Sequence, residues 1–320
     1  MTSKSFTELS GTVPQASPSV PRKIWAAIGR WSFPEVPLAR VAVFRVLIYL
    51  FIIWDMFFLT NDVIPHSYLP EFYKPLWIGR VLPFPDPTVL GAQLLQVALI
   101  VACLVAACGW FARTSGWSVA ILFLAWMENS QGFSYVSHDH MALMVTTWVL
   151  PTVGAAKFFD KTPSQAAGWA LRVTQVATVL TYFGSVFSKV FSNGGSLWAW
   201  PNSAVFTWAF MRRGSDLILW TLNFPLLLKI AQWGLYLIEI LSIAVLFLKG
   251  KWLYVAISFF FAFHFATYLS LGIHFLPTVV CWFAFFPLER IPPWLRQHGV
   301  NLTVVGSVSQ AAPHSLKAKT

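Results

Sequence analysis

The sequence predicts an all-α protein, a polytopic bundle of transmembrane helices, and three observations support this prediction. Hydrophobic residues make up 57% of the 320-residue chain and charged residues only 11%, which is more apolar than a soluble domain of this size requires. The apolar residues gather in long runs, and the basic residues fall in the connections between these runs. The formal net charge of +10 is therefore spread over several connections, which argues against nucleic acid as a partner.

A helix that crosses the hydrocarbon core of a bilayer needs about 20 mostly apolar residues, and this template selects about eight segments of the chain. They lie near 38–60, 89–112, 117–134, 140–156, 172–191, 229–248, 252–271 and 273–287. The fourth and eighth segments are short, and little more than Gly272 separates the last two. Seven spans with additional re-entrant pieces is therefore an open alternative.

Basic residues mark every second connection. They are Arg22, Lys23, Arg30, Arg113, Lys157, Lys161, Lys249, Lys251, Arg290 and Arg296. Because lysine and arginine accumulate in cytoplasmic connections, we expect both termini in the cytoplasm. We assign the chain to a bacterial cytoplasmic membrane, in contact with lipid.

The expected organisation has three parts. Residues 1–37 form a cytoplasmic polar tail with an interfacial helix, 38–287 the transmembrane domain, and 288–320 a cytoplasmic C-terminal tail. The beginning of the chain is rich in Pro and Ser and has no apolar core, so we expect a disordered tail rather than a cleaved signal peptide.

Two long connections, 61–88 and 192–228, fall on the opposite side of the membrane. Both are rich in Pro, Trp and Phe, which is typical of segments that lie on the membrane surface. Arg212 and Arg213 belong to the second connection. These two arginines either attract an anionic substrate or anchor an interfacial helix to lipid headgroups, and the sequence favours neither interpretation.

Cysteine and histidine spacing gives little support to a metal site. Cys103, Cys108 and Cys281 lie in apolar segments and form no Cys-x-x-Cys pair, so neither a zinc site nor a dithiol redox centre is indicated. The His138-x-His140 pair supplies two ligands without an obvious third. We therefore expect no metal.

Several ionisable residues fall inside the expected spans and must pair or line a wet cavity. Arg45 in the first span and Glu239 in the sixth are expected to form a structural ion pair, unless Arg45 reaches the membrane surface. His264 in the seventh span needs a hydrogen-bond partner, and Glu128 or Tyr182 can serve.

Lys189 is the most informative residue, because it is the only lysine inside the long apolar run RVTQVATVLTYFGSVFSKVF. An ammonium group at membrane depth is costly, so such a lysine is expected to have a function, and desolvation allows it to act as a base. Tyr182 precedes it on the same helix.

The connection between the third and fourth spans contains the segment HDHMAL. We expect its residues His138, Asp139 and His140 to lie on the same side of the membrane as Lys189. Asp139 can serve as the N-cap of the fourth span. A neutral imidazole at this place can hydrogen-bond a substrate oxygen or relay a proton.

The order of these motifs resembles the HTTM family, the membrane domain shared with vitamin K-dependent gamma-carboxylases. The resemblance covers most of the chain and rests on four segments: Phe44-Arg45 in ARVAVFRVLIYL, HDHMAL, YFGSVFSK, and His264 followed by the Gly-x-x-Phe stretch of FHFATYLSLGIHFLPTVVCWFAFFP. In the family, a lysine seven residues after a Tyr-Phe pair is the base that deprotonates vitamin K hydroquinone. Lys189 follows Tyr182 at this distance. The family's active-site histidine matches His140 best and His138 second.

The resemblance implies that reduced vitamin K or menaquinol is the cofactor. Its oxidation by oxygen would drive removal of a proton from a glutamate γ-carbon, to which CO2 then adds. It also implies a pocket formed by Tyr182, His138, Asp139 and Glu128, with Arg212 or Arg213 for a substrate carboxylate. Since the sequence contains no cysteine pair, a separate quinone reductase would have to regenerate the quinol.

The sequence also departs from the family. After Lys189 the family commonly continues with a Trp and a Gly at short spacing, whereas here FSNGGSLWAWPNSA delays Trp198 and Trp200 and places Asn202 where a Gly is often found. The vertebrate carboxylases carry a large lumenal domain that binds the substrate propeptide. The sequence after 287 is short, so we expect that mode of recognition to be absent and the substrate to be a small molecule or a peptide.

The sequence is therefore compatible with two functions. The first is a quinol-dependent enzyme with Lys189 as base and His140 in support. The second is a non-enzymatic membrane protein, either a quinone- or lipid-binding subunit or a small-solute transporter, in which Lys189 stabilises the fold.

Overall fold

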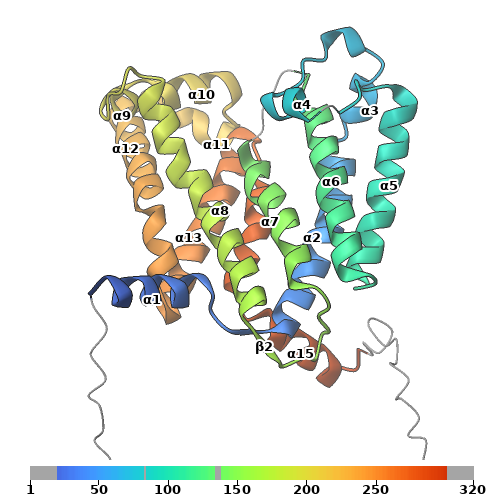
Figure 1. Ribbon diagram of the computed structural model, residues 1–320. Helices are drawn as coiled ribbons and strands as arrows, with labels where there is room; N and C mark the ends of the chain where they lie inside the picture. The colour runs from blue at the N-terminus through green and yellow to red at the C-terminus, as the bar shows by residue number, and fades with distance from the viewer. Residues whose placement is uncertain (1–19, 83, 134–137, 301–320) are drawn as a thin grey trace, which may run out of the picture.

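The computed structural model describes residues 20–82, 84–133 and 138–300, and in these residues the chain is almost entirely helical (Figure 1). Residues 1–19 of the expected disordered tail and the last part of the expected C-terminal tail lie outside the described residues. The rest of the stretch expected to be disordered is helical, in α1 Val20–Ser32. Four of the described helices are long and apolar enough to cross a membrane, which identifies a helical membrane protein. They are α2 Leu38–Phe58, α5 Val89–Ala107, α12 with its 3₁₀ extension over Pro225–Phe247, and α13 Gly250–Leu271.

Helices also form at the other four expected segments. They are α6 Ala112–Gln131, α7 Met141–Val153, α8 Gln165–Phe191, and α14 Leu276–Cys281 continued by η5 Trp282–Phe285. The α14–η5 segment is short, as the sequence indicated. α8 extends seven residues further towards the N-terminus than expected, because Ser164 caps it by accepting a hydrogen bond from the Ala167 backbone at 3.2 Å.

Successive long helices alternate in direction, so the connections divide between the two ends of the bundle (Figure 1). The α5–α6, α7–α8 and α12–α13 connections lie at the lower end with α1 Val20–Ser32 and α15 Ile291–Gln297. The upper end carries short helices from the two long connections. These are α3 Val63–His66, η1 Pro70–Phe72, α4 Trp77–Val81, α9 Ala199–Asn202, α10 Val205–Arg213, α11 Asp216–Leu219 and η3 Trp220–Asn223. The basic residues of every second connection therefore share one end of the bundle.

The lower end has additional structure that the sequence did not predict. A two-residue antiparallel pair joins β1 Val36–Pro37 to β2 Pro163–Ser164. The region expected as a C-terminal tail begins with η6 Leu288–Arg290, where Glu289 accepts two hydrogen bonds of 2.7 Å from Arg40 on α2. This part of the chain therefore packs on the bundle. α1 lies crosswise to the long helices (Figure 1), with Trp25 exposed.

The main core lies between α2, α5, α6, α7 and the first half of α8, with fully buried Phe44, Phe123 and Leu143 at its centre. A second and smaller core joins α8 to α13 and η5, where the rings of Phe260 and Trp282 stack with their centroids 4.9 Å apart. The candidate site lies next to this second core, because Tyr182 belongs to it.

Candidate functional site

Lys189 forms an ion pair with Glu239, which joins the last turn of α8 to α12. The lysine Nζ lies 3.4 Å from the Ser185 hydroxyl, one turn earlier on α8, and 4.3 Å from the ring centroid of Trp200. The side chains of Lys189 and Glu239 are only 16% and 11% exposed. Both charges are therefore largely removed from solvent, and each stabilises the other.

The predicted ion pair between Arg45 and Glu239 is wrong. Arg45 is 2% exposed, and its Nη2 donates a hydrogen bond of 2.7 Å to the carbonyl of Gly154, at the C-terminal end of α7. A cation at this end of a helix interacts favourably with the helix dipole. Glu239 lies on α12 and pairs with Lys189 instead. The sequence analysis was therefore right that Arg45 and Glu239 are buried charges, but wrong that they pair with each other.

The predicted partner Tyr182 for His264 is confirmed, and Glu128 is not the partner. The Tyr182 hydroxyl is hydrogen-bonded to His264 Nε2 and also accepts a bond of 3.0 Å from the Trp282 indole nitrogen. His264 Nδ1 is buried and has no hydrogen-bond partner among the described residues. One ring nitrogen of His264 is therefore used by the protein, and the other is left for a ligand or water.

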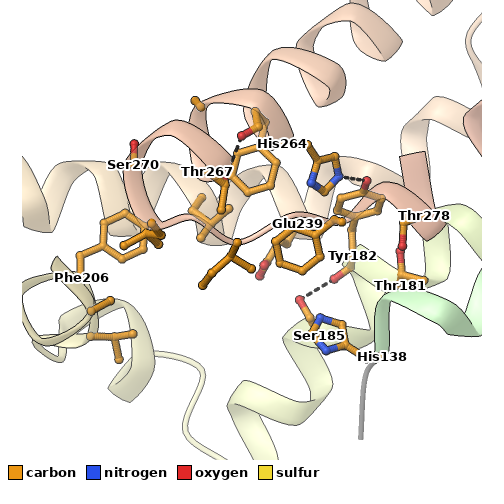
Figure 2. A pocket seen from close by; sticks show the side chains of 18 of the residues that line it. His138, Thr181, Tyr182, Ser185, Phe206, Glu239, His264, Thr267, Ser270 and Thr278 are labelled. Atoms are coloured by element: carbon orange, nitrogen blue, oxygen red, sulfur yellow. Dashed lines mark hydrogen bonds between the residues drawn. The ribbon is translucent and has the colours of Figure 1, made fainter. Parts of the chain in front are cut away.

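These groups face a cavity of about 390 Å³ between α8, α10, α12 and α13, which we call the head cavity. Its walls are mostly apolar, and its polar groups include His138, Tyr182, Ser185, Glu239, His264 and Thr267 (Figure 2). Glu239 lines this cavity, whereas the Lys189 side chain lies behind Glu239 and Trp200 and is not part of the wall. A ligand in the head cavity would therefore meet the carboxylate of the ion pair.

The His138–Asp139–His140 segment is a short 3₁₀ turn whose three side chains divide between two cavities. His138 lines the head cavity. Asp139 and His140 line a second space of about 400 Å³, the polar cavity, together with Asp62, His66 and Arg213, among others. The resemblance matched the family's active-site histidine to His140 first and to His138 second. The structure brings His138, and not His140, to the head cavity beside the Lys189–Glu239 pair.

His140 is held between two carboxylates, with its Nε2 2.9 Å from Asp55 and its Nδ1 3.2 Å from Asp139. Burial lowers the pKa of this imidazole. The hydrogen bonds that its ring nitrogens donate to Asp139 and Asp55, together with the charges of the two carboxylates, outweigh burial and raise the pKa to about 9. His140 precedes α7 and is its N-cap residue, so the expectation that Asp139 caps this helix is wrong. The raised pKa favours the protonated form of His140 between Asp55 and Asp139, whereas we expected a neutral imidazole here.

Three other predicted site residues lie away from the head cavity. Glu128 accepts a hydrogen bond of 2.6 Å from the Leu76 backbone and so holds the connection between α3 and α5 onto α6. The Arg212 guanidinium lies 5.1 Å from the ring centroid of Trp208, and Arg213 lines the polar cavity. Glu128, Arg212 and Arg213 are therefore not part of the head-cavity wall.

The structure adds residues that the sequence analysis missed. They include Trp200, on the helix that follows Lys189, and two residues from the distant C-terminal part of the bundle: Trp282, which donates to Tyr182, and Phe275, which lines both cavities. Ser185 was detectable, because it is four residues before Lys189 on the same helix face. Within the described residues, no group of three or more His, Cys, Asp or Glu is arranged to hold a metal ion.

Comparison of the chain with protein-family models, with curated proteins and with solved structures gave no match. The resemblance to the HTTM family therefore rests on the four sequence segments alone.

Proposed function

We propose that this chain is a membrane protein that binds a lipid-soluble quinol, reduced vitamin K or menaquinol, with its ring in the head cavity. The observation that carries the proposal is the Lys189–Glu239 ion pair, whose carboxylate lines a mostly apolar cavity. A desolvated ion pair at such a place is a functional-site candidate, because its cost in stability needs a reason.

The cavity fits an amphiphilic ring compound. Its volume of about 390 Å³ lies within the range of roughly 300–1,000 Å³ that is usual for small-molecule sites. The side chains that approach it from α8, α12 and α13 include a hydroxyl, a carboxylate and an imidazole, those of Tyr182, Glu239 and His264. Such groups can hydrogen-bond the oxygen substituents of a hydroquinone ring while the apolar walls contact its carbon skeleton.

The ion pair suits removal of a proton from a bound hydroxyl. Glu239 accepts the proton from the hydroxyl oxygen and becomes neutral, and Lys189 keeps its positive charge beside the site. The net charge of the buried site is the same before and after this transfer, so no additional charge has to be desolvated. Lys189 thus remains essential, as its resemblance to the family's base implies, but it acts through the carboxylate that contacts the ligand.

The reaction that follows is proposed from the resemblance to the gamma-carboxylases. A bound hydroquinone supplies the reducing equivalents for oxygen chemistry, and the protein supplies a cavity that limits access of water. The alkoxide formed from the hydroquinone and oxygen would then remove a proton from a carbon atom of a small or peptide substrate, and CO2 would add to the resulting carbanion. A separate quinone reductase would return the oxidised ring to the quinol.

The charge distribution supports the proposed orientation in the membrane. The basic connections share the lower end of the bundle with α1 and α15 (Figure 1), and lysine and arginine favour the cytoplasmic side. We propose that this end, with both termini, faces the cytoplasm of a bacterial cell. The head cavity, which α10 helps to line, would then lie nearer the opposite surface.

The proposal is tested with purified protein in lipid nanodiscs supplied with reduced vitamin K or menaquinol and oxygen. Formation of the quinone epoxide, the product of hydroquinone oxidation by oxygen, is measured by mass spectrometry for the wild type, Glu239→Gln and Lys189→Met. The matched control is Lys229→Met, which removes an exposed lysine on α12. We expect epoxide from the wild type and the control only. Absence of quinol binding to the wild type would refute the proposal.

A non-enzymatic quinone- or lipid-binding subunit is the second candidate, and one observation favours it. Lys189 is already satisfied by Glu239, Ser185 and Trp200, as expected for a cation that only joins two helices. Quinol that binds to the wild type without epoxide formation, in the presence of oxygen, would select this candidate.

A further inference from the structure

α1 is an amphipathic helix whose charged residues are all basic. An α-helix turns by about 100° per residue, so Ile24 and Ile28 lie on one face of α1, with Trp25 at its edge, and Lys23 and Arg30 lie on the opposite face. The helix sequence VPRKIWAAIGRWS contains no acidic residue. α1 lies at the lower end of the bundle (Figure 1), and none of its residues lines the head cavity. Its surface chemistry is therefore separate from that of the candidate site.

The C-terminal end of α1 packs on the bundle through Trp31. The ring of Trp31 stacks on the ring of Phe247, with the two centroids 5.8 Å apart. Arg172 of α8 lies over the same indole, 4.6 Å from the ring centroid, and donates a hydrogen bond of 3.0 Å to the Trp31 carbonyl. Phe247 is the last residue of the candidate span Pro225–Phe247. The contact between Trp31 and Phe247 therefore places α1 at the depth where a span leaves the hydrocarbon of the bilayer.

The apolar face of α1 before Trp31 is exposed. Ile24, Trp25 and Ile28 are 54%, 72% and 46% exposed, and Lys23 and Arg30 are exposed on the other face. A basic amphipathic helix that lies in the plane of the membrane surface buries its apolar face at the boundary of headgroups and acyl chains, and Trp is enriched at this boundary. Figure 1 shows α1 in the required orientation, across the direction of the long helices.

We propose that α1 binds the surface of a leaflet that contains acidic phospholipid, such as phosphatidylglycerol, at the lower end of the bundle. Ile24, Trp25 and Ile28 enter the boundary between headgroups and acyl chains, and Lys23 and Arg30 face the negatively charged headgroups. The contacts of Trp31 join this helix to the bundle. The inference does not depend on the binding of a quinol in the head cavity.

The charge of this surface favours acidic phospholipid over other occupants. Lys249 and Lys251 are exposed and follow closely after Phe247, so they add positive charge to the end of the bundle at which α1 lies. A second copy of the chain that docked through α1 would bring two basic surfaces together, which is unfavourable. A leaflet of neutral phospholipid would cover the apolar face, but it lacks the negative surface potential that attracts lysine and arginine.

The test places a dansyl fluorophore on α1 of the full chain, in vesicles of phosphatidylcholine and phosphatidylglycerol in equal amounts. The label is attached through Ile28→Cys on the apolar face or, as the matched control, through Ala26→Cys on the basic face. Both variants also carry Cys108→Ser, because Cys108 is exposed and the other two cysteines are buried. Bromine atoms, which quench the fluorophore on contact, are carried by the acyl chains of one lipid or of the other. The quenching by brominated phosphatidylglycerol, divided by that of brominated phosphatidylcholine, measures which lipid gathers at α1.

We expect strong quenching of the label on the apolar face, weak quenching of the label on the basic face, and a quenching ratio of about two or more in favour of phosphatidylglycerol. Lys23→Gln with Arg30→Gln should bring this ratio close to one. Lys74→Gln with Arg80→Gln removes the same charge from exposed residues at and before α4, at the upper end, and should leave the ratio unchanged. Thermal melting of each variant shows whether it is folded.

Three results would overturn the proposal. Equal quenching of the two labels would show that the apolar face does not enter the leaflet. A ratio near one for the chain with both basic residues, or a ratio that their replacement does not lower, would show that α1 has no preference for acidic phospholipid. No quenching of the apolar-face label by either lipid would show that protein, such as a second copy of the chain, covers this face.

Discussion

Removal of one partner from the Lys189–Glu239 ion pair should destabilise the protein much more than removal of both. Lys189→Met leaves the Glu239 carboxylate, 11% exposed, without its cation, and Glu239→Gln leaves the lysine ammonium, 16% exposed, without its anion. The double variant Lys189→Met with Glu239→Leu replaces the pair by apolar groups of similar length and leaves no charge behind.

The magnitude follows from the burial of the two groups. Breaking a desolvated pair by removing one partner costs about 3–5 kcal/mol, whereas replacing the whole pair by apolar residues is often neutral or stabilising. Lys189→Met also loses the contact with Trp200, where the ammonium lies 4.3 Å from the ring centroid. With roughly 2–4 °C of melting temperature per kcal/mol, each single variant should melt on the order of 10 °C below the wild type.

The assay is thermal melting of the detergent-solubilised protein over the full double-mutant cycle, with Lys229→Met as the control for loss of an exposed lysine. We expect two low melting temperatures for the single variants and a double variant close to the wild type. Single variants that melt within about 1 °C of the wild type would refute the reasoning, because the pair would then be too well solvated to carry a desolvation cost. A double variant that is stable but forms no epoxide separates the chemical role of the pair from its structural role.

Three further predictions concern other parts of the molecule. Tyr182→Phe removes the hydroxyl that is hydrogen-bonded to both His264 and the Trp282 indole, so it should lower the free energy of unfolding by about 1–3 kcal/mol and weaken quinol binding. An unchanged melting temperature and an unchanged affinity would contradict the hydrogen-bond network. Burial raises the pKa of Glu289, but the hydrogen bonds that Arg40 donates outweigh burial and hold the pKa below its usual value. The stabilisation of the folded protein by this pair is therefore present above the unfolded pKa of about 4.3, and it is lost as the pH falls through the lower folded pKa. The difference in melting temperature between the wild type and Glu289→Gln should therefore shrink on acidification, and a difference that does not depend on pH would contradict this. His140, with a folded pKa of about 9 against roughly 6.5 unfolded, should stabilise the protein fully below pH 6.5 and lose this contribution as the pH rises through 9; melting of the wild type and His140→Gln between pH 6 and 10 checks the sign.

Part of the candidate site could be predicted from the sequence because its residues are chemically unusual for their place. A lysine and a histidine inside apolar runs need partners, and this requirement led to Lys189, His264 and its partner Tyr182. The requirement does not say which partner each group has. Arg45 was therefore paired with Glu239, although the structure places Arg45 at the C-terminal end of α7 and gives Glu239 to Lys189.

The sequence by itself determined the class of the fold, the approximate positions of the long helices and the sharing of one end by the basic connections. These features depend on local quantities, the length and hydropathy of each run and the charges beside it, which the bilayer selects directly. Only the tertiary structure decided that His138 and His140 face different cavities, that Glu239 rather than Lys189 lines the head cavity, and that Phe275 lines both cavities. Those facts depend on how helices far apart in the chain rotate and pack against one another, and helical periodicity fixes which residues share a face but not which face meets which neighbour.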